Sequence, residues 1–366
     1  MANARLQHLK DLTRDAGLDY FVLFIGPSLR YFTGLQKKMT ERPTFYIVNP
    51  NGKDALFISV LERDYARNVL GDDCEYHFYT DLSGHAGPFA EFAEAIGFDG
   101  KQLAMEYMHS RVFEHQMIMG EAPNAQIVDG AHLTAEVRMC KDASEIEKMR
   151  RAIEITEASI NAILPLIKEG ATERQISLAN MNEMISRGSE LTWKFPSVIS
   201  GARSAAPHNR TSDRPFEKGD IVMIDTGAVY EGYTADITRT FALGSIDPEL
   251  EKAYEVVKQA NEAVMTLKAG GMTASVLDQT ARDILVGSGY EHAIMHRTGH
   301  GIGMEGHEAP YIAIGNEMVL REGFMFTVEP GLYFQGKGGI RIEDNVVIAN
   351  GGLEQLTTFT KDLMIL

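Results

Sequence analysis

Two aspartates, Asp225 and Asp236, bracket the segment DTGAVYEGYTAD, and the residues around them predict a β-hairpin. Apolar residues run up to the first aspartate (IVMID) and on from the second (ITRTFAL), with turn-forming residues between them. The aspartates are symmetric about a turn centred between Tyr230 and Glu231, so strands paired without a bulge would place them opposite each other. Because directly opposed like charges destabilise a sheet by up to ~1 kcal/mol, the hairpin needs a cation, a shared proton or an exposed edge.

A second carboxylate pair, Glu329 and Glu343, lies symmetrically about Gly336 in FMFTVEPGLYFQGKGGIRIEDNVVI. One pair alone fits a solvated hairpin. Two pairs in equivalent hairpins indicate that four carboxylates converge, and four unpaired carboxylates in a cleft would be too costly without cations. Two divalent ions would balance their charge.

His300 is a candidate fifth ligand. It lies in HRTGHGIGMEGHEAP, between the two hairpins, among glycines at 299, 301 and 303. These glycines disfavour a helix and let the backbone approach a neighbour closely. Taken alone, a histidine in a glycine-rich loop is more often a hydrogen-bonded loop residue than a ligand.

The elements that must position these groups begin with two helices before the first hairpin. Ser144 and Glu147 are expected to form a capping box for SEIEKMRRAIEITEASINAIL, which ends near Pro165. Thr172 and Gln175 form a second box for TERQISLANMNEMIS. The first hairpin follows these two helices.

The same order then recurs. Asp247 and Pro248 open a helix, Thr273 opens another, and the second hairpin follows. KEGAT and KAGGMT occupy matching places, as do His208 and His307, with about a hundred residues between the two units. The sequence therefore predicts a pseudo-twofold domain over residues 136–366.

Residues 1–135 predict a separate α/β domain. Short apolar runs that suit strands (DYFVLF, FYIVNP, DALFISV, QLAMEY and AQIVDG) alternate there with helical patterns. Neither a GxGxxG motif nor a P-loop follows the first strand, so no nucleotide site is expected.

The composition excludes several classes of protein. A net charge of −16 over 366 residues argues against a nucleic-acid or anionic-membrane partner. No apolar run approaches the ~18 residues of a membrane span. Cys74 and Cys140 have no ligand spacing, which fits a reducing compartment. The N-terminal segment resembles a polar amphipathic helix rather than a signal peptide, and we expect a cytoplasmic protein.

Together these residues resemble the pita-bread metallopeptidases: the methionine aminopeptidases, aminopeptidase P and prolidase. That family holds a dinuclear metal centre with two aspartates eleven apart, a histidine in a GHG loop, and glutamates in VEPG and RIED contexts, and this sequence has all of them in order over roughly residues 190–350. The resemblance implies an α+β pita-bread catalytic domain, preceded by a creatinase-like N-terminal domain. It implies that Asp225 binds one metal, that Asp236 and Glu343 bridge both, and that His300 and Glu329 bind the other.

The resemblance also implies roles around the metals. Glu329 would be the general base and then acid. His208, His296 and His307 match positions that bind substrate or stabilise the tetrahedral intermediate. Arg341 and Tyr333 match positions that bind substrate or support the ligands. From the residues alone, Arg341 could instead be an ion-pair partner, Tyr333 could be strand packing, and Trp193 is expected in the core at the cleft wall.

The N-terminal domain favours the prolidase, aminopeptidase P and creatinase branch, and creatinase lacks the metal ligands. The chain length and the Glu329–Glu343 spacing are more similar to a prolidase, which cuts Xaa-Pro dipeptides. Aminopeptidase P activity on longer Xaa-Pro peptides and a non-peptide hydrolase or lyase of the same fold remain alternatives. A further alternative, from another functional class, is a pita-bread module that binds a partner without catalysis. We expect two divalent ions, Mn rather than Co, Zn or Fe, and, by analogy, a homodimer.

Overall fold

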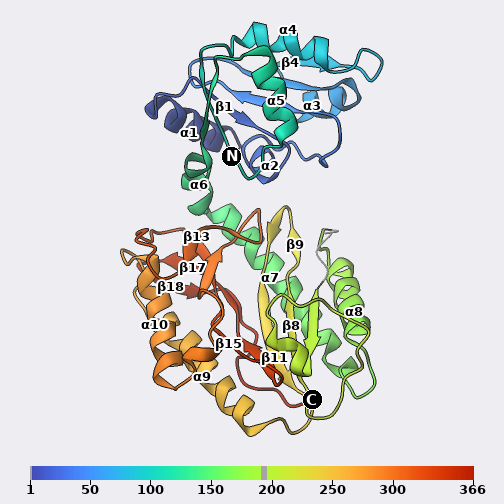
Figure 1. Cartoon of the computed structure of the whole chain (residues 1–366), viewed down its shortest axis with the longest axis vertical. Coiled ribbons are helices and arrows are strands. Elements are labelled where there is room, and N and C mark those ends of the chain that lie inside the picture. The colour runs from blue at the N-terminus through green and yellow to red at the C-terminus, as the bar shows by residue number, and fades with distance from the viewer. Residues whose placement is uncertain (1, 191–195) are drawn as a thin grey trace. The chain divides into compact units, whose positions relative to one another are not determined.

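The computed structural model describes residues 2–190 and 196–366, which form two compact units, one ending at Arg138 and the other beginning at Met139 (Figure 1). The predicted boundary at 135–136 falls inside helix α6 (Ala131–Met139). Trp193 lies outside the described residues. Within these residues, every helix is too short or too polar to cross a membrane.

The N-terminal unit is built on a mixed six-stranded sheet with the order β4-β3-β2-β1-β5-β6. Phe89, Phe92 and Ile118, from two of its helices, pack with strand residues such as Phe57 and Leu103 into one apolar core. Its strands are β1 (Tyr20–Leu23), β2 (Phe45–Val48), β3 (Asp54–Ser59), β4 (Cys74–Tyr79), β5 (Gln102–Met105) and β6 (Gln126–Asp129). Its helices, besides α6, are α1 (Ala2–Asp15), α2 (Pro27–Thr33), α3 (Arg63–Leu70), α4 (Ala86–Ile96) and α5 (Val112–Glu121).

All five predicted strands of this unit are confirmed, and the sequence analysis missed β4. That strand reads CEYHFY and is largely half-buried at the end of the sheet, next to β3. Its polar residues hide the apolar run by which the other strands were found. Cys74 and Cys140 are thiols and form no disulfide in the described structure.

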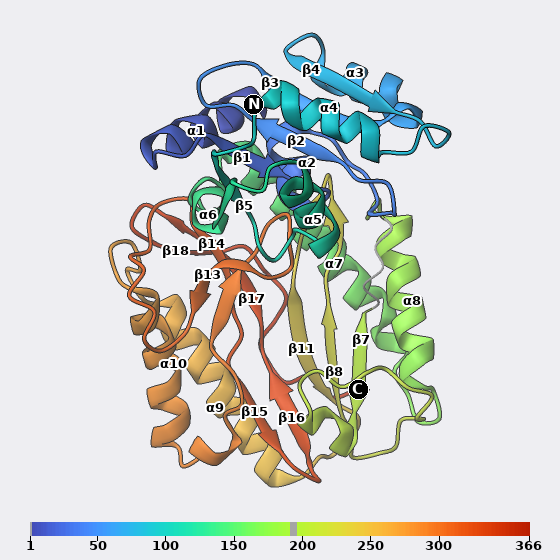
Figure 2. The same cartoon turned by 45° about the horizontal axis from the view of Figure 1, so that its top comes forward.

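The C-terminal unit contains two helix pairs and two sets of strands (Figures 1 and 2). Helices α7 (Ala143–Ile163) and α8 (Glu173–Ser186) pack on the first set, and α9 (Pro248–Met265) and α10 (Ala274–Gly287) on the second. The first set is β7 (Ser197–Ser200), β8 (Ile221–Thr226), β9 (Val229–Tyr230), β10 (Tyr233–Thr234) and β11 (Ile237–Ala242). The second is β12 (Gly299–Gly301), β13 (Glu308–Ile312), β14 (Met325–Val328), β15 (Gly331–Phe334), β16 (Gly338–Arg341), β17 (Asp344–Ala349) and β18 (Gly352–Gln355).

This order of two helices followed by a hairpin, occurring twice, confirms the predicted repeat. The helix starts were predicted at Thr172 and Asp247, and both residues are N-caps whose side chains accept backbone hydrogen bonds. Thr273 is also an N-cap, without a side-chain cap bond. The predicted box of Ser144 and Glu147 is wrong.

The capping box of α7 is formed by Asp142 and Glu145 instead. The Asp142 carboxylate accepts hydrogen bonds from the backbone N–H groups of Ser144 and Glu145, and the Glu145 side chain accepts one from the Asp142 N–H. The side chain of Asp142, two residues before Ser144, therefore accepts hydrogen bonds from the first N–H groups of the helix, and the helix begins before Ser144 could cap it.

Candidate metal centre

Five predicted residues, Asp225, Asp236, His300, Glu329 and Glu343, lie together in the C-terminal unit, and we call them the carboxylate–histidine cluster. Their side chains form overlapping groups whose ligand atoms lie within 4.8 Å of one another: Asp225, Asp236 and Glu343; His300, Glu329 and Glu343; and Asp236, His300 and His307. Each of the five residues lies on a strand or directly next to one. The two hairpins and β12 therefore deliver all five groups to one place.

The first hairpin brings Asp225 and Asp236 together, but in a register other than the predicted one. Tyr230 pairs with Tyr233, so the two turn residues are Glu231 and Gly232. Both have positive φ, 47° and 88°, as a type I′ turn requires. The predicted turn centre was one residue too early.

Asp225 consequently faces Thr238 across the strands, and Asp236 lies two residues before Thr238 on the other side of the hairpin. Side chains alternate with a period of two, so both aspartates still point to the same face. They are diagonal neighbours rather than a directly opposed pair. This spacing leaves their oxygens close enough for one group with Glu343.

The second hairpin has the predicted register. Phe334 pairs with Gly338 and Val328 with Asp344, so the pairing is symmetric about Gly336 on both sides of Glu329 and Glu343. The two glutamates fall between the paired segments and oppose each other. Their backbones bond elsewhere: the Glu343 N–H donates to Thr238 O at 3.1 Å, and the Glu329 N–H donates to Thr298 O at 2.7 Å.

Thr238 joins the two hairpins at the cluster. Its hydroxyl donates to Glu343 Oε2 at 2.6 Å and accepts from Arg341 Nε at 3.0 Å, while its carbonyl accepts the Glu343 N–H. Asn345 supports the opposite side, because its amide exchanges hydrogen bonds with the backbone N–H and carbonyl of Asp236 at 3.2 and 2.6 Å. The sequence analysis missed both residues. Their positions beside predicted ligands, in ADIT and IEDN, were the available signal.

His300 lies on β12, and the glycines around it have the predicted effect. A Cβ on Gly299 would lie 1.9 Å from Thr327 O, and one on Gly301 would lie 2.1 Å from Ala309 O. Only glycine lets β12 fit between its neighbouring strands. His300 Nδ1 lies 3.1 Å from Gly301 O and therefore donates to it, which directs Nε2 toward Glu329 Oε1 at 3.2 Å.

The electrostatics of the cluster match a site for cations. Burial and the charges of Asp236, Glu329 and Asp225 raise the pKa of Glu343 well above its usual value. The carboxylates thus repel one another, and a positive charge among them would relieve the repulsion. Burial opposes ionisation of Glu329, but its hydrogen bond and charge interaction with His300 hold its pKa below the usual range. Carboxylate oxygens with one imidazole suit Mn, Fe, Co or Zn.

Arg341 is buried beside the cluster and links it to Tyr333. Its Nη2 donates to Asp225 Oδ2 at 2.6 Å, and its Nη1 donates to the Tyr333 hydroxyl at 2.9 Å. The ion-pair interpretation of Arg341 is therefore confirmed. Burial raises the pKa of Tyr333 to about 12, so it keeps its proton. Tyr333 also packs in the strand, but its hydroxyl is fully engaged in this chain of bonds.

His296 continues the chain to the surface of a pocket. Its Nδ1 lies 2.7 Å from Arg297 O and donates to it, so Nε2 accepts from the Tyr333 hydroxyl at 2.8 Å. Burial lowers the pKa of His296, which favours this neutral form. The ring of His307 stacks on the ring of His300, with 3.7 Å between the two centroids, next to the carboxylate–histidine cluster.

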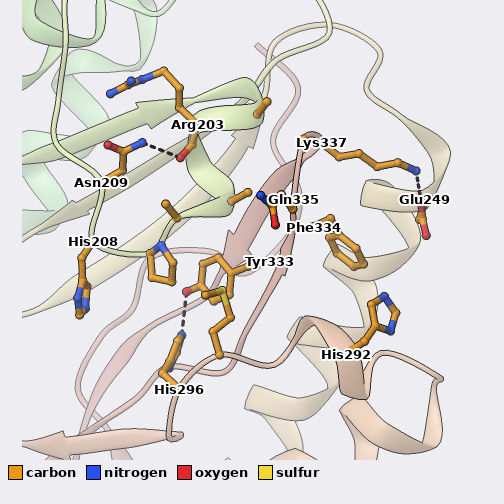
Figure 3. A pocket seen from close by; sticks show the side chains of 16 residues that line it. Arg203, His208, Asn209, Glu249, His292, His296, Tyr333, Phe334, Gln335 and Lys337 are labelled. Carbon is orange, nitrogen blue, oxygen red and sulfur yellow. Dashed lines mark hydrogen bonds and ion pairs between the residues drawn. The ribbon is translucent and has the colours of Figure 1, made fainter.

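The pocket has a volume of about 1400 Å³ and contains His208, His296 and Tyr333 in its lining. Figure 3 shows His208 on the loop that forms one wall, with His296 and Tyr333 on the facing wall. Hydrogen bonds therefore connect His296 to Tyr333, Tyr333 to Arg341, and Arg341 to Asp225. His208 faces the same pocket from the other half of the unit.

The chain matches two protein-family models. Residues 147–350 match metallopeptidase family M24, and residues 5–140 match the creatinase/prolidase N-terminal domain. Among curated proteins, it is 30% identical to a Xaa-Pro dipeptidase of Lactobacillus delbrueckii subsp. lactis, over 99% of this chain and 98% of the relative.

Two solved structures extend the comparison. A prolidase from Thermococcus sibiricus superposes with a TM-score of 0.95 at 31% identity, covering 100% of this chain and 99% of that one. An X-Pro aminopeptidase from Thermotoga maritima superposes with a TM-score of 0.86 at 30% identity, over 99% of both chains. The predicted α+β pita-bread fold with its creatinase-like N-terminal domain is confirmed.

Replacing Glu343 with glutamine should stabilise the metal-free protein at neutral pH. Because the folded pKa of Glu343 is raised, its stabilising contribution is complete below the usual value of 4.5 and is lost as the pH rises toward the folded pKa. Each pH unit in that window costs about 1.4 kcal/mol. Glutamine needs no proton, so Glu343→Gln should raise the free energy of unfolding at pH 7.

Urea unfolding of the chelated proteins between pH 4.5 and pH 8 measures this difference, which should shrink toward the acid end. Glu317→Gln, a change at an exposed position, is the control and should behave like the wild type. A metal-free Glu343→Gln protein that is no more stable than the wild type at pH 7 would show that the carboxylates do not repel one another as described.

Proposed function

This chain belongs to metallopeptidase family M24, with a creatinase/prolidase N-terminal domain, and we propose that it is a dinuclear-metal Xaa-Pro dipeptidase, a prolidase. The observation that carries the proposal is the convergence of four carboxylates and one imidazole beside a pocket lined by histidines. Relatives of the same length named Xaa-Pro dipeptidase and prolidase support the substrate class.

We propose that the carboxylate–histidine cluster holds two divalent ions. Asp225 would hold one ion, His300 and Glu329 would hold the other, and Asp236 and Glu343 would be shared between the two. Mn is the proposed metal, with Co, Zn and Fe as the alternatives, because the donors are hard oxygens with a single imidazole. When bound, such ions lower the pKa of a water toward neutrality and polarise the scissile carbonyl.

Glu329 acts on the attacking water as general base and then on the leaving group as general acid. Its lowered pKa leaves it ionised at neutral pH, so it can accept the water proton. It then passes that proton to the proline nitrogen as the C–N bond breaks. His300 Nε2 lies 3.2 Å from Glu329 Oε1, so the two groups could bind the same ion.

The pocket residues bind and orient the peptide. His208, His296 and His307 contact the substrate or the tetrahedral intermediate, whose oxygen is stabilised most strongly by preorganised donors. The ring N–H of His296 is donated to Arg297 O, so His296 is not itself such a donor in this tautomer. Tyr333 presents its hydroxyl beside His296 at the pocket wall. Arg341 contributes mainly by holding Asp225 and Tyr333 in place, through the bonds that it donates to both.

Aminopeptidase P activity, which removes a first residue before proline from longer peptides, is the second candidate. This second candidate is supported by the similarity to an X-Pro aminopeptidase, which extends over 99% of both chains. The large volume of the pocket also accommodates a peptide longer than two residues. A non-peptide reaction on the same site, or a binding role without catalysis, would be indicated by inactivity on both kinds of peptide.

Substrate length distinguishes the two peptidase candidates. Chelated enzyme reloaded separately with Mn, Co or Zn should release proline from Met-Pro and Leu-Pro at least about tenfold faster than it releases leucine from Leu-Pro-Xaa tripeptides. Mn should give the highest rate. Preference for the tripeptide would identify an aminopeptidase P, and inactivity on both peptides by metal-loaded enzyme would overturn the peptidase proposal.

We also propose that the protein is a cytoplasmic homodimer, as analogy with relatives of this architecture suggests. The two thiols fit a reducing compartment. Sedimentation velocity of the full chain should give the mass of two copies, about twice 40.5 kDa. A single species at the mass of one chain, at micromolar concentration, would contradict the homodimer.

A further inference from the structure

Glu173, the first residue of α8, is fully buried and accepts hydrogen bonds from Ser200 and Ser212, the two residues that flank the segment 201–211, which we call the pocket loop. Its Oε1 accepts from the backbone N–H and the hydroxyl of Ser200, both at 2.9 Å. Its Oε2 accepts from the N–H and the hydroxyl of Ser212, at 2.8 and 2.6 Å. One carboxylate therefore closes the pocket loop at its base, with one oxygen for each end.

This carboxylate is not needed to cap α8. The Glu173 and Arg174 N–H groups donate to Arg214 O and Ser212 O. The Thr172 hydroxyl accepts the Gln175 N–H, and the Gln175 side chain accepts the Thr172 N–H. The first turn is thus satisfied without the Glu173 side chain, so burying a carboxylate here calls for another explanation.

The pocket loop carries the residues that form one wall of the pocket. Arg203, His208 and Asn209 all project from it in Figure 3. Inside the loop, Asn209 Nδ2 donates to Arg203 O at 3.1 Å, and Arg203 Nη2 donates to Arg210 O at 2.6 Å. Arg203 Nε also reaches Glu173 Oε1 at 3.4 Å. Hydrogen bonds within the pocket loop therefore stabilise this wall, and Glu173 connects the loop to helix α8.

We propose that Glu173 is a positioning residue that sets the place of His208 in the pocket. The inference rests on the proposed function, in which His208 contacts the substrate. His208 is exposed, and its position therefore follows the backbone of the loop rather than the packing of its own ring. Only an ionised carboxylate offers acceptors to four donors in two directions. A glutamine would turn its NH₂ group toward the N–H and hydroxyl of one serine.

A double-mutant cycle between Glu173→Gln and His208→Ala tests the proposal on metal-loaded enzyme. Glu173→Gln alone should lower kcat/KM for a Leu-Pro substrate about tenfold, because misplacing a substrate-orienting group by an ångström is costly. In the His208→Ala background, the same change should cost less than about twofold. Equal losses in both backgrounds would mean that Glu173 supports the fold generally, and this would overturn the proposal.

A second measurement does not depend on activity. Cleavage by trypsin after Arg203 and Arg210 reports opening of the pocket loop in the folded protein. It should be about tenfold faster in Glu173→Gln than in the wild type. Glu183→Gln, which changes a half-exposed carboxylate on the same helix, is the matched control and should leave both measurements unchanged.

Ser212→Ala covers the case in which Glu173→Gln fails to fold. It removes one hydroxyl donor to Glu173 and should reproduce both effects at smaller size. Unchanged trypsin cleavage in both variants would overturn the proposal whatever the activity. An inactive wild-type enzyme with faster loop cleavage in Glu173→Gln would instead refute the proposed function and leave the fastening of the loop by Glu173 supported.

Discussion

Repulsion among four buried or partly buried carboxylates is the constraint on which the rest of the C-terminal unit depends. The cluster contains one imidazole and one neighbouring guanidinium, which cannot neutralise four negative charges by themselves. The raised pKa of Glu343 expresses this imbalance, since burial and its three acidic neighbours all favour the protonated form. A fold that gathers such groups without cations would lose stability at neutral pH. Binding of divalent ions turns the same arrangement into a favourable one, so metal binding and stability of this unit are coupled.

The two pseudo-equivalent halves meet at the cluster through backbone and buried polar contacts. Arg239, on β11, is 1% exposed and donates to Asp344 Oδ1 at 2.6 Å and to the carbonyl of Glu343 at 2.7 Å. Thr238, the residue before it, bonds to the Glu343 side chain and backbone. Consecutive residues of one hairpin thereby hold consecutive residues of the other. The carboxylates lie on a strand or directly next to one, which suits a site that must keep its geometry while ions and substrate exchange.

The sequence predicted the site better than it predicted local details of the scaffold. The four acidic residues could be found because the symmetry of the two hairpins is visible in the sequence, whereas His300 was assigned through the resemblance of its GHG loop to the metallopeptidase family. The turn at Glu231 and Gly232 was placed one residue early, because a non-glycine residue with positive φ leaves little trace in the sequence. The links made by Thr238 and Asn345 could not be predicted, since they cross between hairpins about a hundred residues apart. The role of Glu173 was hidden for the same reason: Ser200 and Ser212 are distant from it along the chain.

The central claim is that these five side chains together hold two divalent ions, and calorimetric titration of chelated protein with Mn²⁺ tests it most directly. The account predicts two ions per chain for the wild type, one for His300→Ala, and no tight binding for Asp236→Ala, because Asp236 would bridge both ions. Circular dichroism of the variants would establish that they are folded. Two tightly bound ions in both variants, or none in the wild type, would contradict the account.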